Sequence, residues 1–428
     1  MIRIKLLYSL LLLLLSYTGY SQFQIGAELR PKVLADNGYS VPKPADSKPY
    51  VYVAQRTRLN TLFKGEYIQT YVSVQDIRIW GDDDNFRASG ISGNTTSICL
   101  HQGWFMLKPA EWLSLKIGRQ LLSYDDQRII SARNWNDYQV TYDAILLKAG
   151  NSKNTIDVGI SKNAESSKYS ILPPQKFTMF DFVRYETTGE QLKWSAIALV
   201  TGNSVSDTVD DIRYRSTYGT NLNYSSDLFD ARGSLYFQHN LNEHGGKLRA
   251  FSGSVYINRE FIPAKLVIGA GLDFVSGQDE TRTDVDYLAA DHAFDLFYGN
   301  RHGWYGYMDY FSTMPRQGLQ DYMFKAEYRI TENMSALADY HYFRLAAGIL
   351  DPENAGVALP RELGHELDLT LRWKLTKEAS LQAGYSFFLI TPTLETVKGV
   401  AGNPLRFPQF AYLMITVKPE FTFSTTNN

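Results

Sequence analysis

Aspartate and arginine side chains that could form ion pairs or bind a charged solute lie close together in one stretch, KIGRQLLSYDDQRIISARNW. It begins with the alternation of a strand and then places Arg119, Asp125, Asp126 and Arg128 close together. A guanidinium fork binds a carboxylate through two parallel hydrogen bonds, so these side chains can pair with one another. We predict that Asp125 and Asp126 hold Arg119, Arg128 or Arg133 in place where the strand ends. The alternative is a merely solvated loop.

Other cations recur at every second residue, as Arg56 and Arg58 do in AQRTRLN. Side chains two apart on a strand point to the same face. We interpret this as a cation-lined path for an anionic solute. The alternative is a set of charges that pair with each other and only keep an interior wet. Besides the residues of the opening stretch, the residues assigned to the path are Arg56, Arg58, Asn60, Asp76, Arg78, Arg213, Arg215, Arg232, Lys265, Arg329 and Arg372.

The elements that carry these residues have period two. In LGHELDLTLRWKL, Leu367 and Leu369 fall on one face, while Glu366 and Asp368 fall on the other. A charged face is costly in a dry protein core but stable where it lines water. Short and long connections also alternate, as in outer-membrane barrels with short periplasmic turns and long external loops. We predict an all-β, antiparallel, up-and-down transmembrane barrel of about 18 strands. A soluble β-sandwich is the alternative, but its strands are shorter.

Composition agrees with a barrel and excludes some other classes. The chain has 428 residues, a formal net charge of −2 and 14% aromatic residues. Tyr and Trp are enriched at membrane interfaces. The chain lacks the basic excess of a nucleic-acid binder, so we expect no nucleic-acid partner. Its single cysteine, Cys99, excludes an intramolecular disulfide.

The N-terminus has the pattern of a secretory signal peptide. Arg3 and Lys5 precede an apolar run, and Gly19 and Ser21 are small residues before a cleavage position. We predict a signal peptide over residues 1–21 and a barrel over residues 22–428, located in the bacterial outer membrane.

The sequence shows no motif for a catalytic, metal or cofactor site. HExxH, GxSxG, P-loop and dinucleotide patterns are all missing. The acidic stretches 81–85 and 279–286 could take calcium but lack its ligand spacing, so we expect no cofactor and no structural metal. An embedded hydrolase is the enzyme alternative. Ser335, Asp339 and His341 on one strand would be roughly 13–20 Å apart, too far for a triad.

The longest connection, residues 276–318, ends in YGNRHGWYGYMDYF. Loops longer than about 15 residues are usually functional or disordered, and this one is too aromatic for disorder. We predict that it folds inward as a lid over the passage. Its lid residues are Arg301, His302, Trp304, Tyr305 and Tyr307.

Three stretches together resemble the alginate-export family of outer-membrane barrels. They are RTRLNTLFKGEYIQTYVSVQDIRIWG, IGRQLLSYDDQR and FDLFYGNRHGWYGYMDYF. The resemblance implies a monomeric barrel of eighteen strands with an electropositive constriction that passes a uronate polysaccharide. The aromatic last strand also resembles the signal recognised by the barrel-insertion machinery.

Arg119 conflicts with its assignment to the lumen-facing path, because strict alternation puts it on the same, lipid-facing side of the strand as Leu115 and Ile117. An arginine facing lipid at mid-bilayer would cost about 2–4 kcal/mol. We therefore expect either a bulge at Gly118 that turns Arg119 inward, or a place for Arg119 above the bilayer.

The sequence thus predicts a channel for an anionic solute, and the resemblance implies that this solute is an alginate-like uronate saccharide. The expected partners are that carbohydrate, outer-membrane lipid and lipopolysaccharide, the insertion machinery and a periplasmic export partner. A general diffusion porin or uptake channel is the alternative within the same fold.

Overall fold

The computed structural model describes residues 21–81, 98–162, 179–206, 209–400 and 402–425. The predicted signal peptide therefore lies, apart from Ser21, outside the described residues, as does most of the acidic stretch 81–85. The strands are β1 (Ser21–Asn37), β2 (Tyr50–Lys64), β3 (Ile68–Ile79), β4 (Cys99–Ala110), β5 (Leu113–Gln120), β6 (Tyr142–Gly150), β7 (Asn154–Lys162), β8 (Met179–Thr188), β9 (Leu192–Ser206), β10 (Val209–Ser225), β11 (Asp230–Leu241), β12 (Lys247–Ile262), β13 (Leu266–Val275), β14 (Leu319–Thr331), β15 (Met334–Arg344), β16 (Glu362–Lys374), β17 (Ala379–Ile390), β18 (Gln409–Val417) and β19 (Glu420–Thr425).

From β1 to β18, each strand pairs antiparallel with the next one in the chain, and the sheet closes on itself through β1. β18 pairs with the second half of β1 and β19 with its first half. The two segments are one strand interrupted at Lys418 and Pro419, where proline cannot donate a ladder hydrogen bond. The barrel therefore has 18 strands, and the predicted fold is confirmed.

Side chains alternate between two different environments. The outer face carries exposed apolar residues such as Leu59, Val72 and Leu235, which are 45–56% exposed. The inner face carries buried polar and charged residues such as Arg56 and Asp368. An apolar exterior around a polar interior is the arrangement of an outer-membrane barrel.

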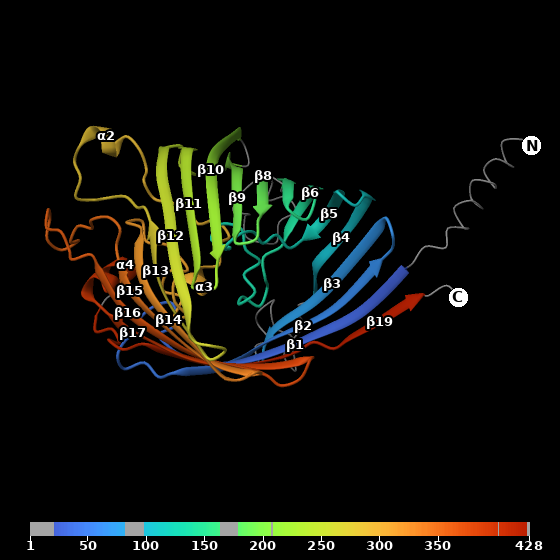
Figure 1. The fold of residues 1–428 in the computed structure, drawn as a ribbon. Coiled ribbons are helices and arrows are strands. Elements are labelled where there is room, and N and C mark those ends of the chain that lie inside the picture. The colour runs from blue at the N-terminus through green and yellow to red at the C-terminus, as the bar shows by residue number, and fades with distance from the viewer. Residues whose placement is uncertain (1–20, 82–97, 163–178, 207–208, 401, 426–428) are drawn as a thin grey trace, which may run out of the picture.

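The two ends of the barrel differ. Connections such as 65–67 and 332–333 are tight turns at one end, where β1 begins and β19 ends. The long connections lie at the other end and hold α2 (Val285–Leu288), α3 (Arg301–Trp304) and α4 (Pro392–Lys398) (Figure 1). Short turns are periplasmic and long loops external in such barrels, so this end is the outer one. Within the described part of the chain, no helix is long and apolar enough to cross a membrane.

Candidate functional site: the plugged lumen

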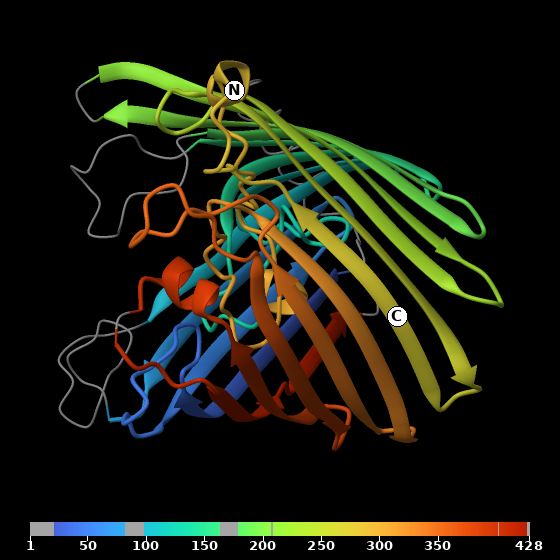
Figure 2. The same ribbon diagram turned by 90° about the vertical axis from the view of Figure 1, so that its left-hand side faces the viewer.

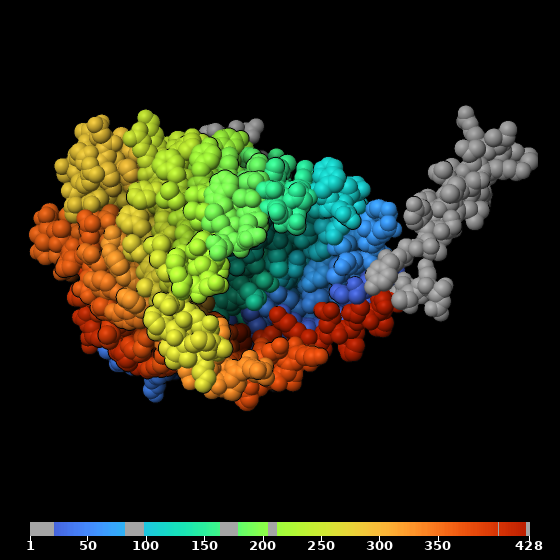
Figure 3. All heavy atoms as spheres, in the orientation of Figure 1, coloured from blue at the N-terminus to red at the C-terminus, as the bar shows by residue number. Residues whose placement is uncertain are grey.

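Two long connections, 121–141 and 276–318, fold into the ring of strands (Figure 2). Their apolar side chains, among them Ile130, Leu296, Met308 and Phe311, are at most 2% exposed. They pack against inward-facing wall residues in one hydrophobic cluster. We call residues 121–141 and 294–311 the plug. The molecule remains hollowed between the green and blue strands in the space-filling view (Figure 3).

The two parts of the plug bind each other. Ile130 and Tyr298 form a parallel bridge, and the amide of Asn300 donates to the carbonyl of Gln127 at 2.8 Å. The Arg133 guanidinium donates to the carbonyls of residues 297, 298 and 299 at 2.8–3.0 Å. Burial, together with the nearby charge of Arg301, lowers the pKa of Arg133 to about 10. The plug is therefore one interlocked body.

All five predicted lid residues make contacts within the plug. The His302 ring stacks between Trp135 and Tyr307, with ring centroids 4.1 and 4.6 Å away. Trp304 donates from its indole nitrogen to the carbonyl of Asp126 at 2.8 Å. Arg301 donates to carbonyls of its own loop. Tyr305 is only 3% exposed, and its amide donates to the carbonyl of Arg301 at 2.8 Å.

Arg128 ties the plug to the wall. Its Nη1 donates to Asp273 of β13 at 2.6 Å, and its Nε lies 2.9 Å from Asp126. The guanidinium also lies over the Trp304 ring, 4.0 Å from the centroid. The cation thus joins both loops and the barrel.

Asp125 has a different partner from the one that the sequence suggested. It accepts from Arg184 of β8 at 2.6 Å and from Ser195 of β9 at 2.5 Å. Arg133 binds carbonyls rather than either aspartate. Arg184 escaped the sequence analysis because no second cation stands two residues from it on its strand.

The predicted cations of β2 face inward and contact residues 134–139 of the plug. Arg56 pairs with Glu28 and donates to the side-chain oxygen of Asn134 at 3.0 Å. Arg58 donates to Gln75 at 2.9 Å and to Gln139 at 2.7 Å. Asn60 accepts from Ser73 at 2.7 Å on the same face.

Two further cations of this wall were missed by the sequence analysis, although they also stand two residues apart. Arg30 donates to the carbonyl of Asn134 at 2.6 Å and to Asp137 at 2.7 Å. Lys32 lies 3.5 Å from Asp137 and donates to the carbonyl of Trp135 at 3.3 Å. The alternation of side chains in ELRPKVLAD puts both cations on one face, so this pattern could have identified them despite the proline between them.

The remaining predicted cations of the strands divide between the plug and the open inner wall. Arg215 donates to Asp295 of the plug at 2.5 Å, and Arg213 donates to the carbonyl of Glu243 at the rim. Arg232, Arg329 and Arg372 are exposed and share the inner face with buried residues of their strands. Arg329 pairs with Glu260, while the Arg232 guanidinium lies 4.9 Å from the ring centroid of Tyr256.

Four residues that were predicted to line the path do not line the lumen, and their assignment is corrected. Asp76 and Arg78 pair with each other at 2.6 Å on the face of exposed Val72, because the register sets Asp76 opposite Thr57. Arg119 pairs with Asp143 on the outer face at the outer end of β5, where both side chains are 42–51% exposed. Gly118 has φ +124°, but the register with β6 continues without a shift, so it turns no side chain inward. Lys265 lies in a periplasmic turn.

Two carboxylates of β16 hold the 276–318 loop from the other side of the lumen. Glu366 accepts from the amide of Met308 at 2.7 Å, and Asp368 accepts from the amide of Tyr307 at 3.1 Å. Gly306 has φ +83°, and a Cβ there would lie 2.5 Å from the Glu366 carboxylate. The turn at 306–308 therefore requires glycine against the acid.

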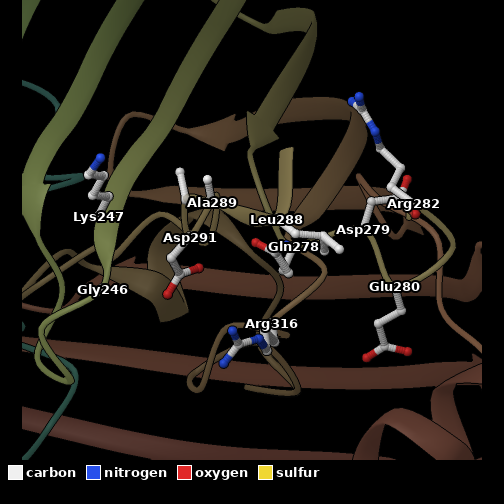
Figure 4. Close-up of a pocket in the computed structure, with 11 residues that line it drawn as sticks. Gly246, Lys247, Gln278, Asp279, Glu280, Arg282, Leu288, Ala289, Asp291 and Arg316 are labelled. Atoms are coloured by element: carbon white, nitrogen blue, oxygen red, sulfur yellow. The ribbon is translucent and has the colours of Figure 1, made fainter. Parts of the chain in front are cut away.

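Two cavities flank the plug on the outer side. One of about 490 Å³ lies at the rim, where Asp291, Glu280 and Arg316 project from loops (Figure 4). The other, of about 380 Å³, lies between β1–β3 and residues 135–138. Among the described residues, no group of three or more His, Cys, Asp or Glu side chains could hold a metal ion.

Comparison with known proteins agrees with this architecture. The alginate export family model matches residues 23–161. This span runs from β1 to the end of β7 and confirms the resemblance seen in the sequence. No curated protein matches the chain.

Solved structures extend the likeness over nearly the whole length. OccAB4 of Acinetobacter baumannii has a TM-score of 0.61 at 12% identity, covering 93% of this chain and 98% of its own. OccK11 (OpdR) of Pseudomonas aeruginosa has 0.58 at 11% identity, covering 94% and 98%. OpdK of Pseudomonas aeruginosa, solved with vanillate, has 0.55 at 11% identity, covering 93% and 99%. These likenesses show the fold, an 18-stranded barrel like those of the outer-membrane channels.

Proposed function

We propose that the protein is a substrate-selective channel for an anionic saccharide of the uronate type. The observation that carries this proposal is a set of inner-wall cations without carboxylate partners. Within the described ranges, four inner-wall cations make no ion pair, namely Arg232, Arg372, Lys116 and Lys374. Arg232 lies beside Trp304 of the plug, and Arg372 lies beside Tyr307. A guanidinium that is free of carboxylates keeps its full attraction for an anion.

Aromatic rings beside these cations support a sugar ligand. The Arg232 guanidinium lies 5.5 Å from the Trp304 ring centroid and 4.9 Å from that of Tyr256. Lys116 lies 4.0 Å from the Trp104 ring centroid. Amphipathic rings supply apolar contact area beside a polar edge. A uronate offers both a carboxylate and a weakly polar ring face to such sites.

The sealed wall at plug level argues against a general diffusion pore. Polar inward residues of five separate strands are completely buried there, namely Gln120, Thr217, Gln238, Asp321 and Ser386, each at 0% exposure. A wide water-filled pore would leave such side chains wet. Passage therefore requires a solute that the lumen recognises.

A small aromatic carboxylate is the second candidate. A structure of OpdK, which shares the fold, contains vanillate. The same unpaired cations and rings would suit such an acid.

The test is a planar-bilayer recording in a salt gradient. We expect wild-type channels to favour anions, and the double variant R232S/R372S to lose several-fold in the anion-to-cation permeability ratio. The control R119S/R259S removes two arginines from the outer face, where Arg259 shares the side of β12 with exposed Val255 and Ile257, and should leave the ratio unchanged. A cation-selective wild type would refute the proposal. Blockade by oligouronates, but not by their carboxyl-reduced counterparts or by vanillate, would select the saccharide.

A further inference from the structure

Two cations stand at the outer end of β12, on the face that points away from the lumen. Along the first residues of this strand, Leu248 and Ala250 are buried inside the barrel, whereas Lys247 and Arg249 are exposed. Successive side chains of a strand point to opposite faces, so both cations project outward. They therefore do not line the passage of the solute.

A row of aromatic rings lies on the membrane side of these cations. Tyr218 of β10 is paired with Phe237 of β11, and Phe237 is paired with Phe251 of β12. All three side chains are 46–49% exposed on the outer face. Aromatic side chains collect where the hydrocarbon of a membrane meets the lipid headgroups. The row therefore marks the outer interface of the bilayer.

Both cations stand at the level of the headgroups. Arg249 is two residues and Lys247 four residues beyond Phe251 in the outward direction. At a rise of about 3.3 Å per residue and a strand tilt of about 40°, these positions are roughly 5 Å and 10 Å above the ring row. A lipid whose chains cover Phe251 brings its phosphate to this height.

The charges of these two side chains are not neutralised by the protein. Within the described part of the chain, neither Lys247 nor Arg249 forms an ion pair. Arg78 of β3 and Arg119 of β5 also lie on the outer face near the outer ends of their strands, but each pairs with an aspartate at 2.6 Å. The outer end of β12 thus differs from those sites in keeping its positive charge available.

Two carboxylates of the neighbouring loops have other partners. Asp291 accepts from the amide of Ala293 at 3.0 Å and from a side-chain amide at 2.8 Å. Its carboxylate and the Lys247 ammonium point in opposite directions (Figure 4). Glu243 lies 3.6 Å from the ring of His244. An anion that approaches from the lipid side therefore meets the cations first.

The backbone beneath the two cations is held on both edges. On one edge, Lys247 pairs with Leu241 and Arg249 pairs with His239 of β11. On the other edge, which β13 does not reach, Asp291 takes the place of a strand. Its amide donates to the carbonyl of Lys247 at 2.7 Å, and its carbonyl accepts from the amide of Arg249 at 2.8 Å. The site is therefore ordered before a ligand binds, which lowers the entropic cost of binding.

We propose that Lys247 and Arg249 form a surface site for the phosphate groups of lipopolysaccharide in the outer leaflet, with the acyl chains lying along Phe251 and Val255. A guanidinium binds two phosphate oxygens through parallel hydrogen bonds, and an ammonium binds phosphate as a point charge. The two cations stand at different heights. Lipopolysaccharide spreads its anionic groups over several sugar units, whereas a glycerophospholipid carries its phosphate at a single height.

The first test measures the binding of lipid A, the phosphorylated anchor of lipopolysaccharide, to the detergent-solubilised protein by native mass spectrometry. The variant K247S/R249S removes the proposed site. The control R259S/K265S removes two exposed cations from the periplasmic end of the same hairpin. We expect K247S/R249S to bind lipid A several-fold more weakly than wild type, and the control to match wild type. Equal affinity of all three proteins, or equal losses in both variants, would overturn the inference.

The second test uses the unmodified protein and so does not depend on a variant folding. Wild type should bind lipid A several-fold more tightly than the same lipid stripped of its phosphates, and the difference should shrink at high salt because exposed charges are screened. Equal binding of the two forms would mean that only the apolar face is recognised, and the inference would fail. Phosphatidylglycerol bound as tightly as lipid A would exclude lipopolysaccharide as the specific partner. Neither test depends on the solute that the channel passes.

Discussion

Arg128 offers the sharpest test of how the plug is held. The substitution R128M keeps much of the side-chain length but removes a charge that is 3% exposed. It leaves Asp273, which is only 2% exposed, without its partner at 2.6 Å, and it removes the cation that lies over the Trp304 ring. Asp126 loses its ion pair at the same time.

The expected magnitude follows from burial. Removing one member of a buried ion pair costs about 3–5 kcal/mol, because the other charge stays desolvated. At about 1.4 kcal/mol for each factor of ten, the closed plug should lose roughly 10²–10⁴ in its equilibrium against opening. The exposed pair Arg329–Glu260, with both side chains 45–46% exposed, provides the control. R329M should cost no more than about 1 kcal/mol.

Amide hydrogen exchange measures this opening directly, because local opening sets the exchange rate. Peptides from 121–141 should exchange faster in R128M by that factor, while peptides from the strands serve as internal controls. The double variant R128M/D273N removes both charges and should recover much of the loss. Equal exchange in R128M and R329M, or a double variant no better than R128M, would refute the assignment of Arg128 as a buried electrostatic anchor.

Two further perturbations test other contacts of the loops. G306A should loosen the 276–318 loop more than G356A does: both glycines have positive φ, but only at Gly306 would the Cβ meet the Glu366 carboxylate, at 2.5 Å. Proteolysis of the loop compares them, and equal cleavage would contradict the steric argument. Lys398, at the end of α4, has its pKa lowered to about 8 by burial. A base with a depressed folded-state pKa destabilises the folded state fully below that pKa, and the penalty fades as pH rises towards its unfolded value. The Tm difference between K398M and wild type should therefore grow in favour of K398M as pH falls from about 10 to 8, then stay constant. A pH-independent difference would exclude a buried ammonium.

The sequence determined the barrel, because strand alternation is a local property. Each strand shows its two faces within ten residues or so, and tight turns and long loops alternate along the chain. The inward position of Arg56, Arg58, Arg215 and Arg372 follows from the same period. The aromatic content of 276–318 also indicated an ordered loop.

Alternation alone does not say which face is which when both carry polar residues. In β3, Gln75 and Asp76 are both polar, and only the pairing of Asp76 with Thr57 places it outside. Arg119 is likewise decided by its pairing with Asp143. Register with a neighbouring strand is information that a single strand does not contain.

Only the tertiary structure decided what the charges of the opening stretch do. Arg128 and Asp273 are 145 residues apart, and Arg30 and Asn134 are 104 apart. The loops reach these partners because the closed barrel brings its strands around one lumen and leaves the loops to fill it. No local pattern fixes such contacts, since the partner of a buried cation is whichever carboxylate or carbonyl the packing of distant segments brings within hydrogen-bonding distance.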